Sequence, residues 1–268
     1  MTVVVAFYCT DGVVVAADSM ITPTIGGFNI GHHSGIKCSV IAGQQLFAFS
    51  GDQGFADRFK VLAELSAPNI AAANHPLGHA VALSQAIIQQ LASTGITLKD
   101  IGTNTILGFL HGGNYYCCVF EGALQPRFLD ANHYYVALGT GKLSADPFLR
   151  FVTDTFCSNG QPHVHLATFL AVWTVQHVID VNPGGIAGPI RVSVFERDQG
   201  GAIVARELTP AQIAAHGQAI EDAANALRQW RNGIQGGAAA GDVIAPPAAP
   251  VMPALPVAVA APAGAVNP

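Results

Sequence analysis

The stretch MTVVVAFYCTDGVVVAADS, residues 1–19, decides the fold. It holds two continuous apolar runs, residues 2–9 and 12–17, on either side of Asp11-Gly12. Asp-Gly between apolar runs favours a tight turn, so we expect the two runs to pair as a β-hairpin. Neither run alternates between apolar and polar residues, which is typical of strands in a sheet that is covered on both faces.

Thr2 becomes the amino-terminal residue if Met1 is removed. Such a threonine carries a nucleophilic hydroxyl beside an α-amine with a reference pKa of about 7.7–8.0, so the amine can accept the hydroxyl proton near neutral pH. The small side chain of Thr2 would let a methionine aminopeptidase expose it. Many chains with a small second residue lose Met1 without using it in catalysis, so the hypothesis needs support from residues further along.

That support comes from Asp18, which ends the second apolar run, and from Lys37, which begins another at 37–42. A lysine at the head of an apolar strand needs an anionic partner, and Asp18 is a candidate. A cation held near an amine lowers the pKa of that amine and keeps it neutral as a base. Thr2, Asp18 and Lys37 therefore form a chemically coherent set.

Apolar periodicity predicts the remaining elements. The segment 22–27 is rich in turn-forming residues and is expected to be a loop. Two sheets packed face to face with helices outside would bury all the apolar faces. Strands are expected at 37–42, 45–50, as a series within 103–138, at 189–196 and at 201–207, and helices from 53 to about 65, 77 to about 91, 142–157, 164–181 and 209 to about 230.

These motifs, in this order, resemble the β-type, proteolytically active subunits of the proteasome, including the simpler bacterial members, which are N-terminal nucleophile hydrolases and threonine peptidases. In that family an N-terminal threonine is followed by a strand, a turn, a strand ending in Ala-Asp-Ser or similar, a lysine and a Gly-containing turn. The resemblance covers roughly residues 2 to 205. It implies that Thr2 is the nucleophile, Asp18 holds the lysine, Lys37 tunes the nucleophile, and the Gly51 N–H stabilises the oxyanion.

Two later motifs extend the resemblance. Ala137-Leu-Gly-Thr-Gly141 matches the Gly-Ser-Gly turn of the family, with Thr140 in place of the serine. Asp180-Val-Asn-Pro-Gly-Gly185 matches Asp-x-x-Ser-Gly-Gly, which braces the N-terminal threonine, but Pro183 replaces the serine and offers neither hydroxyl nor N–H. A carboxylate near a helix C-terminus is unfavourable, so we expect the Thr2 amine to compensate Asp180. The alternative is that Asp180 is a solvated carboxylate at the end of the helix.

Alignment from Lys37 places four residues at the first specificity pocket of the substrate. Phe49 in this position indicates a shallow apolar pocket. The four residues are Ile21, Gly35, Phe49 and Gln53.

The resemblance implies an α+β fold, specifically the four-layer αββα sandwich of N-terminal nucleophile hydrolases. It implies a threonine-type endopeptidase without metal or organic cofactor, acting on peptides or unfolded proteins. Because such sites are harmless only when enclosed, it also implies self-association into one or two rings in the cytoplasm, with an ATP-dependent unfoldase as a possible partner.

The domain organisation predicted is a hydrolase domain over 1–207, a C-terminal helix over 208–233 and a tail over 234–268. Thr209-Pro210 supplies an N-cap and a first-turn proline for that helix. The tail is rich in Ala and Pro, and its seven prolines from Pro246 to Pro268 argue against a transmembrane helix, so we expect it to be disordered or polyproline II.

Composition limits the partners. Only 11% of residues are charged and the net charge is −5, so neither nucleic acid nor an acidic membrane is indicated. The five cysteines form no CxxC pair and indicate reduced thiols, and no secretory signal is evident. The pairs His32-His33 and His163-Val-His165 lack further ligands at zinc spacing, so no metal site is assigned.

Three alternatives remain open at this stage. The same nucleophile could serve a small-molecule amidase or acylase, which an open pocket and no ring would favour. The chain could instead be an inert ring subunit or scaffold, for which Pro183 argues mildly. Finally, Met1 could be retained, which would leave Thr2 without a free amine.

Overall fold

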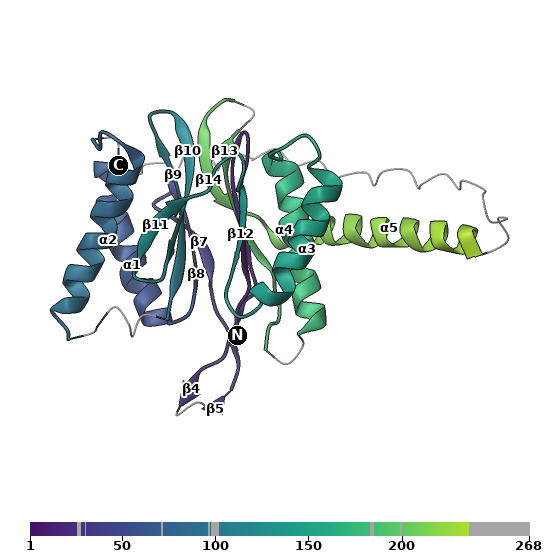
Figure 1. Ribbon diagram of the computed structural model, residues 1–268, viewed down its shortest axis with the longest axis horizontal. Coiled ribbons are helices and arrows are strands. Elements are labelled where there is room, and N and C mark those ends of the chain that lie inside the picture. The colour runs from purple at the N-terminus through teal and green to yellow at the C-terminus, as the bar shows by residue number, and fades with distance from the viewer. Residues whose placement is uncertain are drawn as a thin grey trace, which may run out of the picture.

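The computed structural model describes residues 1–25, 28–29, 31–70, 72–95, 97, 102–182, 185–198 and 200–235. These residues form a mixed α+β fold with two five-stranded antiparallel sheets and five α-helices (Figure 1). The segment 236–268, which is nearly all of the predicted tail 234–268, lies outside the described residues. All five cysteines are free.

The first sheet contains the N-terminal hairpin, which confirms the prediction from residues 1–19. Its register pairs Val4 with Ala17, and the Cys9 N–H donates to the Gly12 carbonyl at 2.8 Å to close the turn. Gly12 is required here because a Cβ would lie 2.1 Å from the Phe195 carbonyl oxygen of the neighbouring strand. In spatial order the strands are β12 (Tyr135–Leu138), β1 (Val4–Tyr8), β2 (Gly12–Ala17), β13 (Arg191–Arg197) and β14 (Ile203–Glu207).

The second sheet follows the predicted strands closely. Two short strand pairs connect the sheets: β3 (Met20–Ile21) pairs with β6 (His33–Ser34), and β4 (Thr24–Ile25) pairs with β5 (Phe28–Asn29). Of these strands, only β4 lies in the segment 22–27, for which a loop is expected from the sequence. In spatial order the large sheet contains β11 (Gln125–Phe128), β10 (Asn114–Glu121), β9 (Asn104–His111), β8 (Gln45–Ser50) and β7 (Cys38–Ile41).

Alternate residues of β1 enter different cores, which explains its continuous apolar run. Val5 and Phe7 belong to a core beneath helices, whereas Val4 and Ala6 belong to a core shared with residues of the second sheet such as Leu46. Successive side chains of a strand point to opposite faces, so both faces of β1 must be apolar. The expectation of a sheet covered on both sides is confirmed.

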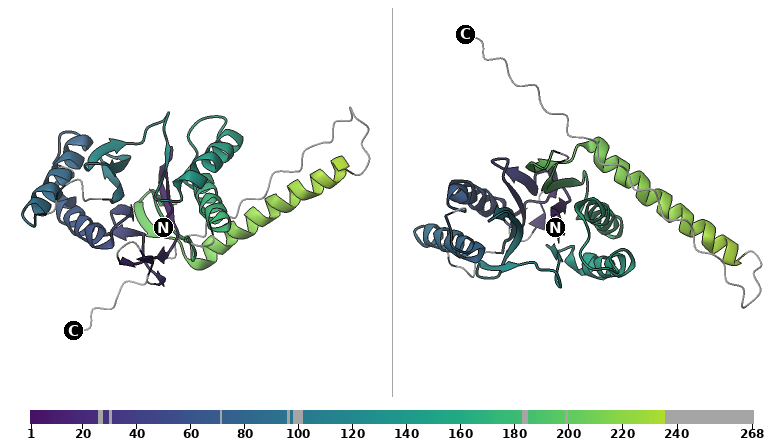
Figure 2. Two further views of the ribbon diagram at one scale, coloured as in Figure 1. Left: turned by 60° about the horizontal axis from the view of Figure 1, so that its bottom comes forward. Right: turned by 90° about the horizontal axis from the view of Figure 1, so that it is seen from above.

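Helices pack against the outer face of each sheet (Figures 1 and 2). Helices α1 (Gln53–Ser66) and α2 (Pro76–Ala92) pack on the second sheet through a core that includes Phe59, and a short 3-10 helix, Ala67–Asn69, follows α1. Helices α3 (Lys142–Phe156) and α4 (Val164–Val181) pack on the first sheet. Among the described helices α4 alone is long and apolar enough to cross a membrane, but 56% of it is buried in the fold, as in a core helix.

Helix α5 (Pro210–Gln235) confirms the predicted C-terminal helix over 208–233 and ends two residues beyond it. The predicted N-cap is present: the Gln212 N–H donates to the Thr209 hydroxyl at 3.3 Å, and the Gln212 side chain accepts from the Thr209 N–H at 2.8 Å. The first half of α5 packs against α4, and the second half projects beyond the body of the molecule (Figures 1 and 2).

Candidate active site

A buried ion pair joins Asp18, directly after β2, to Lys37, directly before β7. The Lys37 Nζ is 2.9 and 2.8 Å from the two Asp18 carboxylate oxygens, and the side chains are 3% and 0% exposed. The Asp18 carboxylate also accepts the N–H groups of Val3 and Met20 at 2.9 and 3.1 Å. The structure therefore pairs Lys37 with Asp18 as expected. Burial lowers the pKa of Lys37, and the Asp18 carboxylate opposes that shift.

Lys37 also reaches the peptide bond in front of Thr2. Its Nζ donates to the Met1 carbonyl oxygen at 3.3 Å, and the Thr2 hydroxyl donates to the same oxygen at 2.8 Å. The Thr2 N–H donates to the Thr140 hydroxyl at 3.1 Å. The structure thus brings together Thr2, Asp18, Lys37 and Thr140, which come from three separate parts of the chain.

A glycine turn fixes the backbone of Thr2. The Gly141 N–H donates to the Thr2 carbonyl oxygen at 3.0 Å. Gly139 has a φ of +89°, and a Cβ there would lie 2.2 Å from that same carbonyl oxygen. The Gly-Thr-Gly turn is therefore needed because the Thr2 backbone lies directly against it.

The charges of Lys37 and Asp18 also act on the terminal amine. With Met1 present, the terminal amine belongs to Met1, and its pKa is lowered by burial and then by the Lys37 ammonium, with the Asp18 carboxylate acting in the opposite direction. Removal of Met1 transfers the free amine to Thr2. The lowering of the pKa that is expected for the Thr2 amine is thus found for the amine of Met1, next to Thr2.

An open cleft of about 1110 Å³ adjoins this cluster. Thr2, Lys37 and Gly51 line it, and Gly51 has a φ of +124°. The four residues expected at the specificity pocket line the same cleft: Ile21, Gly35, Phe49 and Gln53.

Charged residues that the sequence analysis missed lie on the same cleft. Asp57 and Lys60 line it together with Gln53, and the Gln53 amide donates to the Asp57 carboxylate at 2.9 Å. These three residues are spaced by four and three along α1 and so share one helix face. That spacing was visible in the sequence once Gln53 had been placed in the pocket. Asp52 and Glu207 complete the charged lining.

Asp180 does not join the cluster, contrary to the expected contact with the Thr2 amine. Its side chain is exposed on α4, accepts from the Gln176 amide at 2.7 Å, and lines a separate groove. The Thr2 nitrogen instead donates to Thr140. Pro183, in the same motif, lies outside the described residues. Within the described part of the chain no cluster of three or more His, Cys, Asp or Glu side chains could hold a metal ion.

No protein-family model and no curated protein matches the chain. Solved structures with a similar fold share 13–16% of their sequence with this chain. They are Anbu proteins. A Gly-1 mutant from Hyphomicrobium sp. strain MC1 has a TM-score of 0.64 at 16% identity, covering 91% of this chain and 100% of that one. Anbu, described as an ancestral beta-subunit, from Yersinia bercovieri has 0.63 at 13%, covering 85% and 97%.

A third similar structure, a helical assembly of the Anbu complex from Pseudomonas aeruginosa, has a TM-score of 0.60 at 16% identity and covers 87% of this chain and 94% of that one. The expectation that the chain is a β-type proteasome subunit was therefore wrong: the structural neighbours are Anbu proteins, a distinct family. These likenesses establish the fold.

Proposed function

We propose that this chain is a threonine-type endopeptidase with an Anbu-like fold, active after removal of Met1. The observation that carries the proposal is the shared contact of the Lys37 ammonium and the Thr2 hydroxyl with one carbonyl oxygen, that of Met1. A catalytic site needs a nucleophile and a charge at the same reacting group. Buried contacts with Asp18 fix the ammonium here, and hydrogen bonds at the exposed surface of the cleft fix Thr2. Two sheets that share a core, each with helices on its outer face, support a four-layer αββα sandwich.

The proposed reaction begins when the Thr2 Oγ attacks a peptide carbonyl carbon. The hydroxyl proton passes to the Thr2 amine, directly or through a water molecule, and then to the leaving amine as the peptide bond breaks. The Gly51 N–H stabilises the negative oxygen of the tetrahedral intermediate. Water then hydrolyses the ester on Thr2 and regenerates the hydroxyl.

The pair formed by Lys37 and Asp18 has a defined role in this scheme. The ammonium disfavours a second positive charge nearby, so it lowers the pKa of the Thr2 amine and keeps the amine neutral at neutral pH. Asp18 holds the ammonium in position and accepts the Val3 N–H, which anchors the residue next to the nucleophile. Thr140 orients the amine through its hydroxyl.

The cleft supports an extended polypeptide as substrate. It is open to solvent, and Ile21, Gly35 and Phe49 line it together with charged side chains of α1. We propose that Phe49 and Ile21 form a shallow apolar pocket for the residue before the cleaved bond. Gln53 lies at the boundary between the apolar and the charged parts.

We further propose that the chain acts within a self-associated ring or helical assembly in the cytoplasm. The solved Pseudomonas aeruginosa structure is a helical assembly of the Anbu complex, and the similarity of fold makes a related assembly a reasonable proposal. Enclosure would restrict the site to unfolded chains, and an ATP-dependent unfoldase would be a fitting partner.

Intact-mass spectrometry with a threonine-directed epoxyketone or β-lactone tests the chemistry. We expect the wild-type protein to lack Met1 and to gain one adduct on Thr2, and the Thr2→Ala variant to gain none. A protein that retains Met1 and forms no adduct would contradict the proposal and favour an inert subunit. Hydrolysis of unfolded casein, measured in parallel, separates an endopeptidase from an amidase that accepts only small substrates.

A further inference from the structure

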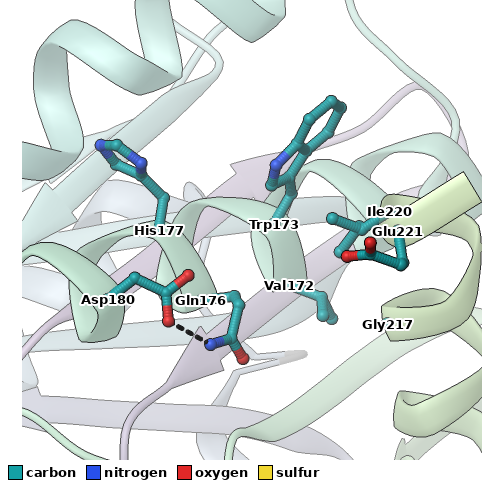
Figure 3. A pocket seen from close by; sticks show the side chains of 8 residues that line it. All are labelled: Val172, Trp173, Gln176, His177, Asp180, Gly217, Ile220 and Glu221. Carbon is teal, nitrogen blue, oxygen red and sulfur yellow. Dashed lines mark hydrogen bonds between the residues drawn. The ribbon is translucent and has the colours of Figure 1, made fainter. Parts of the chain in front are cut away.

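Helices α4 and α5 enclose a groove of about 330 Å³ that the proposed chemistry does not use (Figure 3). Val172, Trp173 and Ile220 supply its apolar surface. The carboxylates of Asp180 and Glu221 also line it, one from each helix. Gly217 lies in the same wall, and a Cβ there would have no heavy atom within 4 Å. The groove is thus apolar and acidic, with space at Gly217.

The packed face of α5 continues beyond the body of the molecule. Residues on this face are spaced by three and four, as in a helix that packs along its whole length: Ile213, His216, Ile220, Ala223 and Leu227. Those up to Ala223 pack against the rest of the chain, whereas Leu227 is 48% exposed on the projecting half (Figure 2).

We propose that the projecting segment 227–231 of α5 docks in the α4–α5 groove of a second copy of this chain, and that the second copy docks reciprocally. The inference rests on the proposed self-association and names the surface that mediates one of its contacts. The groove and the segment belong to the same face of one chain, so a two-fold axis would satisfy both at once.

The geometry of α5 favours a second copy over the same chain as occupant. Leu227 is seven residues beyond Ile220, so it lies on the same face but about 10 Å further along the helix axis. A continuous helix cannot return that side chain to its own groove. In the proposed pairing, Leu227 of a second chain supplies the apolar group for this groove.

Charge supports the same pairing. The docking segment carries Arg228 and Arg231 and no acidic residue, whereas the groove carries Asp180 and Glu221. Arg228 already pairs with Glu221 of its own helix at 3.0 Å, so Arg231 and Asp180 are the charges that remain for a contact between two chains. The Arg231 guanidinium contacts the amide oxygen of Asn232, with no carboxylate partner among the described residues. In the reciprocal arrangement it would approach the acidic rim of the second copy, where a cation is favoured.

The first test fills the groove without disturbing the fold. Gly217→Leu would place a side chain in open space on a helix, so the variant should fold at least as stably as the wild type. Gly78→Leu is the matched control, because Gly78 lies on α2 and also has no atom within 4 Å of an added Cβ. We expect sedimentation velocity to show association weakened about tenfold or more by Gly217→Leu, with no change for the control.

The second test is a cross-link between two singly substituted chains, Gly217→Cys and Leu227→Cys. Mild oxidation of the mixture should give a disulfide-linked dimer, and Arg231→Glu in the Leu227→Cys chain should reduce its yield. A wild-type assembly that Gly217→Leu leaves intact, or no cross-link in the mixture, would overturn this interface while self-association stands. A monomeric wild type at micromolar concentration would overturn both, and the adduct on Thr2 reports the chemistry independently.

Discussion

The N-terminus and the last turns of α5 differ in the contacts that hold them. At the N-terminus the amide, carbonyl and hydroxyl of Thr2 all have partners, and Lys37 and Asp18 lie buried beside them. In the last turns of α5, the side-chain contacts of Arg228 and Arg231 are with residues of the same helix. A reacting group needs a fixed position before substrate arrives. A docking segment can become ordered against its partner.

Removal of the buried cation should have the largest effect at the N-terminal end. Lys37→Met leaves the Asp18 carboxylate buried without its counter-ion, so we expect a loss of about 3–5 kcal/mol of stability in urea unfolding, together with loss of the adduct on Thr2. Lys142→Met is the control, because Lys142 and Asp146 form an exposed pair and the loss should be below about 1 kcal/mol. Equal losses of stability in Lys37→Met and Lys142→Met would contradict a special role for the buried pair.

Acid should weaken the inner half of α5, where His216 is buried. Burial, and then His165 across the helix contact, lower the pKa of His216 to about 4. The unfolded chain binds this proton below about pH 6.5 and the folded chain only below about pH 4, so stability should fall by up to about 3 kcal/mol as the pH decreases through that window.

Urea unfolding at pH 7 and pH 4.5, with hydrogen exchange of α5, measures this effect. His216→Phe should remove a large part of the pH dependence between those values. His133→Phe, at an exposed loop position, should leave the dependence as it is in the wild type. The same slope in the wild type and in His216→Phe would show that another group is responsible.

A single methyl group on the Gly139 turn should displace the nucleophile. Gly139→Ala places Cβ against the Thr2 carbonyl and holds alanine at positive φ, so we expect kcat/KM to fall about 100-fold and stability by about 1–2 kcal/mol. Gly112→Ala incurs a similar backbone strain at φ +58° with no atom within 4 Å of the added Cβ, and should retain full activity. Peptide hydrolysis assays on both variants separate displacement from strain.

The smallest effect is expected at Thr140. Thr140→Val removes the hydroxyl that accepts the Thr2 N–H, a contact worth about 1 kcal/mol, so kcat/KM should fall about fivefold. Thr140→Ser keeps a hydroxyl at this position and should remain near the wild-type rate. If valine and serine behave alike, Thr140 does not orient the amine.

The sequence was sufficient for the parts of the fold that local pattern determines. The N-terminal hairpin followed from two apolar runs around Asp11-Gly12, and α1 to α4 followed from helical periodicity. The pairing of Asp18 with Lys37 followed from the high cost of an unpaired charge in an apolar strand. The proposed roles of these residues remain predictions.

Other features depend on contacts that a linear pattern does not contain. Asp180 was assigned by motif, but it lies two residues after the buried Val178, which is about 200° around the helix and away from the core. Pairing between distant short segments created the hairpins of residues 20–34. The likeness to Anbu proteins came from the overall arrangement of the fold, which the short motifs around Thr2 and Lys37 do not contain.

The position of Met1 has a consequence for any fusion protein. Its carbonyl oxygen lies where the Thr2 hydroxyl and the Lys37 ammonium converge, and its side chain rests against Gly185. Any residue joined to the Thr2 nitrogen also converts the amine to an amide, which cannot accept the hydroxyl proton in the proposed reaction. An affinity tag that leaves even one residue before Thr2 should therefore abolish the proposed activity, so the tag belongs at the other end of the chain.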